Sequence, residues 1–274
     1  MKWDAPTISV ILSTYNRPQA LIRVLDSLEH QLRIDMGKVD VVVVDDGSDI
    51  DLTGLFSDYS FKFRYLYVPR EADNSPMLET CKNLAVSMTQ GDIILQLDDD
   101  LSFHERTLSE IQNMASSFAM FQCEWWLWTP RLSSSRDRTD TRWEYLRGPK
   151  GYWYDGCVAW ETATWNQCSS AGMIMPRIVW DKLGGYDMDF NGAIGFADQE
   201  LALRAVKAHI PLFVAPIFFH IDDSETGSWR DILNAKLNRS NEKKFLDKHP
   251  DMWDWCTDKI RDRFAKNVQN YVEF

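Results

Sequence analysis

The stretch Ile93-Ile94-Leu95-Gln96-Leu97-Asp98-Asp99-Asp100 indicates both a fold and a chemistry. Its apolar first part predicts a buried strand, and the three aspartates that follow put concentrated negative charge at the end of that strand. Like charges this close are costly unless a cation neutralises them. Carboxylate oxygens suit Mg²⁺ or Mn²⁺ rather than zinc, and such a metal in turn suits a diphosphate. Because a triple aspartate alone is more often a solvated acidic turn, the preceding residues have to decide.

Those preceding residues repeat a strand–helix pattern. Apolar runs predict strands at residues 8–12, 39–44 and 63–68, and helical spacing predicts helices at 20–32 and 78–88. Near-continuous Val and Ile runs that alternate with helices indicate a parallel sheet covered on both faces. We therefore expect an α/β fold.

Three of the predicted strands end in polar clusters, at residues 13–17, 45–48 and 98–100. In open parallel sheets, ligands bind beyond the carboxyl ends of the strands. One cluster could arise by chance, but three on strands of the same sheet point to one site.

Five segments resemble the family 2 glycosyltransferases, which have the GT-A fold. Three of them are Ser13-Thr14-Tyr15-Asn16-Arg17-Pro18, Val44-Asp45-Asp46-Gly47-Ser48 and residues 91–100. The other two, Leu183-Gly184-Gly185-Tyr186-Asp187 and residues 196–204, match the family's Gly-Gly-Phe-Asp and Glu-Asp-x-Glu-Leu-x-x-Arg patterns. Each motif alone is weak, but five in the same order and spacing over residues 6–222 are specific.

The chain departs from the family patterns at two places. Ala197 replaces the usual acidic residue before Asp198, which leaves one acidic candidate for the catalytic base. Cys81-Lys82-Asn83 stands where the family often has Ala-Arg-Asn, so Lys82 or Arg70 would have to replace an Arg contact to the diphosphate.

The resemblance implies a Rossmann-like, mostly parallel sheet flanked by helices, with an aromatic-rich acceptor region and C-terminal helices. It assigns residues 1–222 to a GT-A domain, with a nucleotide-sugar half at 1–120 and an acceptor half at 121–222. Residues 223–274 form the predicted helical extension.

The function implied by the resemblance is metal-dependent, inverting transfer of a sugar from a nucleotide-sugar to a hydroxyl of a glycan or other acceptor. A UDP-sugar is the expected donor, because Tyr15 would offer a stacking face and the Asp46 carboxylate would accept from the uracil imide N–H. Asp98 and Asp99 would lie nearest the ribose. The full set of expected donor-binding residues is Ser13, Tyr15, Arg17, Asp46, Lys82, Asp98 and Asp99.

Asp100 is the expected ligand of a Mn²⁺ or Mg²⁺ ion. His220, which ends the apolar run 212–219, is a second candidate, because GT-A folds commonly add a C-terminal His to the metal shell; a hydrogen-bonded structural His is the alternative. In the resemblance, the acidic residue at the position of Asp198 deprotonates the acceptor. A helix N-cap is the alternative role for this residue.

Between Phe121 and Trp165 the chain holds seven tryptophans, which form either a packed aromatic core or a platform for sugar rings and bases. Four arginines in the same stretch could hold an anionic acceptor: Arg136, Arg138, Arg142 and Arg147. They are the only support for a nucleic-acid acceptor, which is one alternative. A non-catalytic nucleotide- or glycan-binding relative is another.

Composition agrees with a soluble enzyme. The net charge of −11 argues against a general nucleic-acid surface, which needs clustered Lys and Arg. The five cysteines form no CxxC pair, so reduced thiols in a cytoplasmic setting are expected. No stretch approaches the roughly 18 apolar residues of a membrane span.

Overall fold

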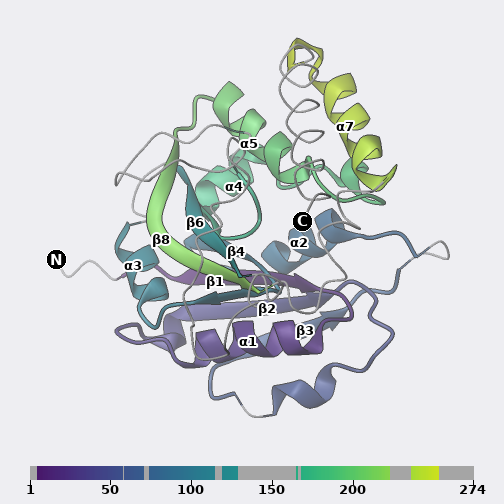
Figure 1. The fold of residues 1–274 in the computed structure, drawn as a ribbon. Coiled ribbons are helices and arrows are strands. Elements are labelled where there is room, and N and C mark those ends of the chain that lie inside the picture. Colours follow the sequence, from purple (N-terminus) through teal and green to yellow (C-terminus); the bar gives the residue numbers. More distant parts are fainter. Residues whose placement is uncertain are drawn as a thin grey trace, which may run out of the picture.

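The computed structural model describes residues 5–57, 59–70, 74–114, 119–128, 165, 168–222 and 236–252. Within them, eight strands form one sheet in the order β3-β2-β1-β4-β7-β6-β8-β5, with helices on both faces (Figure 1). The strands are β1 (Ile8–Thr14), β2 (Val39–Asp45), β3 (Phe63–Tyr67), β4 (Ile93–Asp98), β5 (Leu101–Phe103), β6 (Met120–Trp128), β7 (Met173–Pro176) and β8 (Leu212–Asp222). The helices are α1 (Pro18–Glu29), α2 (Leu78–Ser87), α3 (Thr107–Met114), α4 (Arg177–Leu183), α5 (Ala197–Lys207) and α7 (Lys236–Lys248).

The half of the sheet that the N-terminal residues form is wholly parallel. In it β1 pairs with both β2 and β4, and β2 pairs with β3, all in parallel register. The other half is mixed, because β7 runs antiparallel to β4 and β6, while β6 and β8 are parallel to each other. The predicted α/β fold is confirmed, and its parallel part is the part that the Val and Ile runs indicated.

The valines of β2 show why a continuous apolar run forms a strand here. Val41 and Val43 pack in the cluster that includes Leu21 of α1, whereas Val42 and Val44 pack in the cluster that includes Ala85 of α2. Successive side chains of a strand point to opposite faces, so a strand with helices on both faces needs apolar residues at every position. Figure 1 shows α1 on one side of the sheet and α2, α4 and α5 on the other.

Helix α7 belongs to the same packed unit as the sheet. Its Phe245 is fully buried in the cluster that also contains Leu201 of α5. The Asn241 amide donates to the carbonyls of Phe190 and Gly195, at 3.0 Å each. The proposed boundary after residue 222 stays a prediction, because residues 223–235 and 253–274 lie outside the described part.

The predicted acceptor region falls largely outside the described residues. Of the stretch 121–165, only the strand residues up to Trp128 and the single residue Trp165 are described, and the four arginines are not. Trp165 stacks on Phe245, with ring centroids 5.4 Å apart. The choice between aromatic core and sugar platform therefore stays open. In the described part of the chain, no helix is long and apolar enough to cross a membrane.

Candidate active site

The three polar clusters meet at one edge of the sheet. In the parallel register Thr14 lies opposite Asp45, and Ser13 lies opposite Asp98. The carboxyl ends of β1, β2 and β4 are therefore level with one another, as their parallel order requires. The sequence-predicted residues of the donor site come together here.

Arg17 binds the aspartate cluster directly. Its Nη1 lies 2.5 Å from Asp99 Oδ1, and its Nη2 lies 3.1 Å from Asp100 Oδ2. Thr14 donates a third contact, from Oγ1 to Asp99 Oδ2 at 2.8 Å. Asn16 has a positive φ of 53°, a conformation that Asn tolerates, and this turn brings Arg17 back over the end of β4. One guanidinium thus offsets part of the charge of two carboxylates.

The cluster still carries more negative charge than its neighbours offset. Burial raises the pKa of Asp98 to about 6, against the opposing effect of Lys82 and with further rises from the charges of Asp100 and Asp198. Burial also raises the pKa of Asp100 to about 6, against Arg17 and together with the charge of Asp99. Carboxyl groups that resist ionisation at this edge would be stabilised as anions by a further cation.

The side chains that could bind a metal at this edge of the sheet fit a hard divalent cation. They offer carboxylate oxygens, which Mg²⁺ and Mn²⁺ prefer. Among the described residues, no group of three or more His, Cys, Asp or Glu side chains forms a ready-made metal site. Mg²⁺ is usually bound by one or two carboxylates together with substrate phosphates, so the metal role of Asp100 stays a prediction. His220 lies in β8 opposite Ser102 of β5, but its side chain is outside the described part, so its role as a ligand stays a prediction.

Tyr15 and Asp46 are the two residues predicted to bind the nucleotide base. Arg70 contacts both of them. Asp46 is fully buried, and its Oδ2 lies 2.7 Å from Arg70 Nη2. The Met77 N–H donates to its Oδ1 at 3.0 Å. The Arg70 guanidinium also lies over the ring of Tyr15, 3.3 Å from its centroid, which is cation–π geometry. From the sequence, Arg70 was a candidate contact to the diphosphate. In the structure it contacts Asp46 and Tyr15, and its Nη1 donates to the Asn74 carbonyl at 3.3 Å.

A glycine makes this approach of Arg70 possible. Gly47 has φ +78°, and a Cβ there would lie 2.8 Å from the backbone N of Arg70. Any side chain at this position would push the segment around Arg70 away from the loop after β2.

Asp198 lies at the start of α5 and faces three side chains from other segments. Lys82 Nζ is 3.3 Å from its Oδ1, and the Tyr186 hydroxyl donates to the same oxygen at 2.6 Å. Ser170 Oγ lies 3.4 Å from its Oδ2 and donates more closely, at 2.7 Å, to Asp98 Oδ1. The described contacts of this carboxylate are thus with side chains that face the aspartate cluster, and not with the helix backbone. Its role as the base stays a prediction.

Lys82 lies close to both Asp198 and Asp98. It is buried, a condition that lowers the pKa of a lysine, but the charges of Asp198 and Asp98 outweigh burial and raise the pKa of Lys82. The ammonium group therefore keeps its charge at neutral pH and bridges the two carboxylates by electrostatic attraction. Lys82 thus lies beside two of the other predicted site residues, and its role in donor binding stays a prediction.

The structure adds site residues that the motifs did not identify. Ser170, which contacts Asp98 and Asp198, lies outside every motif, so the sequence carried no signal for it. Tyr186 could have been noticed, because it has a hydroxyl where the family pattern has Phe. Gln96 lies in the middle of β4, where its 2.5 Å contact with the Tyr186 hydroxyl depends on tertiary packing.

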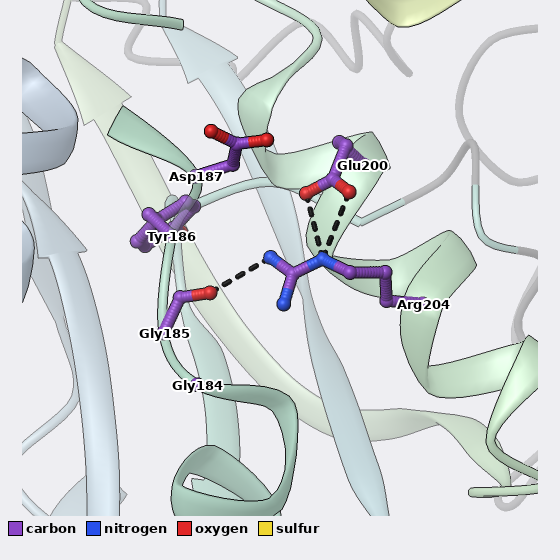
Figure 2. Close-up of a pocket in the computed structure, with 6 residues that line it drawn as sticks. All are labelled: Gly184, Gly185, Tyr186, Asp187, Glu200 and Arg204. Atoms are coloured by element: carbon purple, nitrogen blue, oxygen red, sulfur yellow. Dashed lines mark hydrogen bonds and ion pairs between the residues drawn. The ribbon is translucent and has the colours of Figure 1, made fainter. Parts of the chain in front are cut away.

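The motif around Gly185 is fixed by Arg204, as Figure 2 shows. Arg204 Nε lies 2.8 Å from Glu200 Oε1, and its Nη2 donates to the Gly185 carbonyl at 2.7 Å. Gly185 has φ +76°, and a Cβ there would lie 2.7 Å from Asn83 Oδ1. A pocket of about 270 Å³ is lined by Gly184, Gly185, Tyr186, Asp187, Glu200 and Arg204. The arrangement holds the turn against α5 and so positions Tyr186 beside Asp198.

Comparison with known sequences identifies relatives of this chain. The family model described as Glycosyl transferase family 2 matches residues 9–151. An uncharacterized glycosyltransferase of Mycobacterium tuberculosis is 25% identical over 230 residues, which are 83% of this chain and 79% of that protein. The hyaluronan synthase of Pasteurella multocida is 33% identical over 95 residues, which are 35% of this chain and 10% of the synthase.

Solved structures share the fold. Residues 1–349 of S. aureus TarS, in complex with UDP, have a TM-score of 0.59 at 15% identity, with 90% of this chain and 71% of that chain covered. The mannosyltransferase PcManGT from Pyrobaculum calidifontis, in complex with GDP-Man and Mn²⁺, has a TM-score of 0.56 at 16% identity, with 83% and 60% covered. These similarities confirm the GT-A fold.

Proposed function

The chain belongs to glycosyl transferase family 2, and we propose that it transfers a sugar from a UDP-sugar to an acceptor hydroxyl with inversion, in a reaction that depends on a divalent cation. The observation that carries this proposal is the convergence of Asp198, Lys82 and the Asp98–Asp100 cluster at one edge of the sheet. This arrangement supplies a candidate base, a fixed positive charge and oxygen ligands within one site.

The nucleotide base of the sugar donor would bind at Tyr15 and Asp46. A pyrimidine offers a flat face to Tyr15 and an imide N–H to the Asp46 carboxylate. Because Arg70 covers the Tyr15 ring and pairs with Asp46, base binding requires Arg70 to move or to stack on the base itself. TarS binds UDP, which supports a uracil nucleotide, whereas PcManGT binds GDP-Man, so a guanine nucleotide is the main alternative.

The donor diphosphate would lie beyond Asp98 and Asp100. Asp100 would hold a divalent cation, which supplies charge neutralisation for the departing nucleoside diphosphate. Arg17 keeps Asp99 and Asp100 in place from the β1 side. Asp98 and Asp99 would face the ribose.

The Asp198 carboxylate would accept the proton of the acceptor hydroxyl as that oxygen attacks the anomeric carbon. A bond forms between the acceptor oxygen and the anomeric carbon. The bond from that carbon to the phosphate oxygen breaks, and its electron pair leaves with the nucleoside diphosphate. One displacement from the opposite face inverts the configuration. Retention would need a second displacement and an enzymic nucleophile for the first one, and the sequence indicates no such nucleophile.

A thermal-shift panel tests the donor. The panel contains UDP-glucose, UDP-galactose, UDP-N-acetylglucosamine and GDP-mannose, each with and without Mn²⁺. A donor present at 100 times its Kd stabilises the protein by about 2.7 kcal/mol, which is several degrees in Tm. We expect a UDP-sugar to give the largest shift, with Mn²⁺ required for most of it.

The Asp100→Asn variant is the matched control, since it keeps the side-chain shape and removes the charge. It should lose the Mn²⁺-dependent part of the shift. The proposal is wrong if no nucleotide-sugar stabilises the wild-type protein with Mn²⁺ or Mg²⁺. Proton NMR of the product decides the stereochemistry, since an α-linked donor should give a β-linked product.

A further inference from the structure

The hydroxyl of Tyr186 lies between two polar side chains inside the protein. Tyr186 is buried, and its Oη is 2.6 Å from Asp198 Oδ1 and 2.5 Å from Gln96 Oε1. In the family pattern this position holds Phe, which has no hydroxyl. The additional oxygen therefore makes contacts that the motif itself does not require.

The direction of the two hydrogen bonds of the Tyr186 hydroxyl can be assigned. A tyrosine hydroxyl has one proton and donates it to one partner, and the carboxylate is the stronger acceptor. Gln96 then has to turn its amide NH₂ toward the Tyr186 oxygen, and amide O and N positions are interchangeable in such an assignment. Gln96 is fully buried, so water does not compete for it. The resulting chain runs from Gln96 through Tyr186 to Asp198.

Tyr186 is held rigidly enough to act as a fixed donor. Its backbone N–H donates to Asn83 Oδ1 at 2.8 Å, and the Asn83 amide donates back to its carbonyl at 2.9 Å. Its ring packs edge-on against Trp180, with centroids 5.8 Å apart. Arg204 fixes the preceding carbonyl of Gly185, as Figure 2 shows.

The two oxygens of Asp198 are therefore unequal. Oδ1 receives both Lys82 and the Tyr186 hydroxyl, while the described contact of Oδ2 is the 3.4 Å approach of Ser170, whose closer acceptor is Asp98. The carboxylate keeps 17% of its side-chain surface exposed, so an acceptor can reach it.

We propose that the Tyr186 hydroxyl is a positioning group for Asp198, which together with Lys82 saturates Oδ1 and leaves Oδ2 as the oxygen that takes the acceptor proton. This inference rests on the proposed function, because it assumes that Asp198 is the base. Tyr186 acts through Asp198 and does not itself touch the reacting atoms.

Other charged and titratable groups also face Asp198. Lys82 and Glu79 come from α2, Asp98 from β4, and Cys168 from the segment before β7. Burial and the charge of Asp198 raise the pKa of Tyr186, so its hydroxyl keeps its proton and remains a donor at neutral and mildly basic pH. Of these groups, only Tyr186 and Lys82 donate to Oδ1 among the described residues.

The test is Tyr186→Phe, which keeps the ring and removes one oxygen. Without this donor the ionised form of the base is less stabilised, so the acid limb of the kcat–pH profile should move to higher pH by about one to two units. A base that is no longer oriented should lower kcat at pH 7 about 10-fold or more, with the donor KM unchanged within twofold. The assay follows hydrolysis of the UDP-sugar selected by the thermal-shift panel, with water as acceptor.

Tyr65→Phe is the matched control. The Tyr65 hydroxyl donates to Asp45 Oδ2 at 2.6 Å, so its removal deletes the same kind of contact away from Asp198. This variant should leave the acid limb in place. Thermal unfolding of both variants checks that each is folded at the assay temperature.

Two results separate this inference from the proposed function. If Asp198→Asn is inactive while Tyr186→Phe keeps the wild-type acid limb and kcat, the positioning role is refuted and the base assignment stands. If Asp198→Asn keeps more than about a tenth of the activity, the base assignment fails and the positioning role fails with it.

Discussion

Glu79 offers a sharp test of how this site is balanced electrostatically. It is the second residue of α2 and only 2% exposed, yet among the described residues it has no ion-pair partner within 4.0 Å, and its Oε2 has no hydrogen bond. Burial raises the pKa of Glu79 to about 7, and Lys82 offsets only part of that rise. The folded protein thus binds a proton at Glu79 more tightly than the unfolded chain does.

The size of the effect follows from that shift. The pKa of Glu79 rises from 4.5 to about 7, and one unit corresponds to about 1.4 kcal/mol. Ionised Glu79 therefore costs about 3 kcal/mol of folding free energy at pH 8. The sign follows from proton binding: between pH 4.5 and 7 the folded state holds more protons, so stability falls as the pH rises through this window.

The substitution that tests this is Glu79→Gln. The glutamine is neutral at every pH and has nearly the same shape as the glutamate that it replaces. We expect the variant to be more stable than wild type by about 3 kcal/mol at pH 8, with the gain falling below about 1 kcal/mol at pH 5. Urea denaturation, followed by tryptophan fluorescence at both pH values, measures the free energy of unfolding of each protein. The fluorescence signal is strong because the chain has 12 tryptophans.

Glu200→Gln is the control, because Glu200 is equally buried, at 3% exposed, but pairs with Arg204 at 2.8 Å. The same substitution there removes a partnered charge and should destabilise the protein at both pH values. If Glu79→Gln is no more stable than wild type at pH 8, or gains equally at pH 5, the electrostatic reasoning for Glu79 is refuted.

Three further predictions concern the reaction. Asp100→Ala should abolish Mn²⁺-dependent donor hydrolysis while the protein stays folded by circular dichroism; full activity in the variant, or undiminished wild-type activity in excess chelator, would contradict the metal role. UDP should bind more tightly than GDP in calorimetric titrations with Mn²⁺, and the reverse order would overturn the assignment of Asp46 and Tyr15 to a pyrimidine. Asp198→Asn should lower kcat at least about 10²-fold with donor affinity kept, because only the transition state needs the proton transfer.

The sequence alone predicted the parallel half of the fold closely. The helix predicted at 20–32 forms as α1 at Pro18–Glu29, and the strand predicted at 39–44 forms as β2 at Val39–Asp45. Both succeed because local periodicity and burial agree: β2 is covered on two faces, so its valines had to be continuous. The position of the site followed from the same logic, since parallel strands bring their carboxyl ends to one edge.

The mixed half of the sheet could not be predicted from the sequence in the same way. Strand β7 is four residues long and lies antiparallel between β4 and β6, far from both in sequence. A run this short has no periodicity that distinguishes it from a turn. Its place is decided by its partners, and partners distant along the chain leave no local signal.

Within the site, the sequence by itself determined which chemical groups are present, and the tertiary structure decided what each group touches. The motifs predicted that Asp198, Lys82 and the aspartates of β4 belong to one site, because motifs are read from the local sequence. Only the folded chain showed that Arg70 lies on Tyr15 and that the Tyr186 hydroxyl reaches Asp198. Those contacts join segments that no spacing rule connects, and they depend on side-chain packing at distances of about 3 Å.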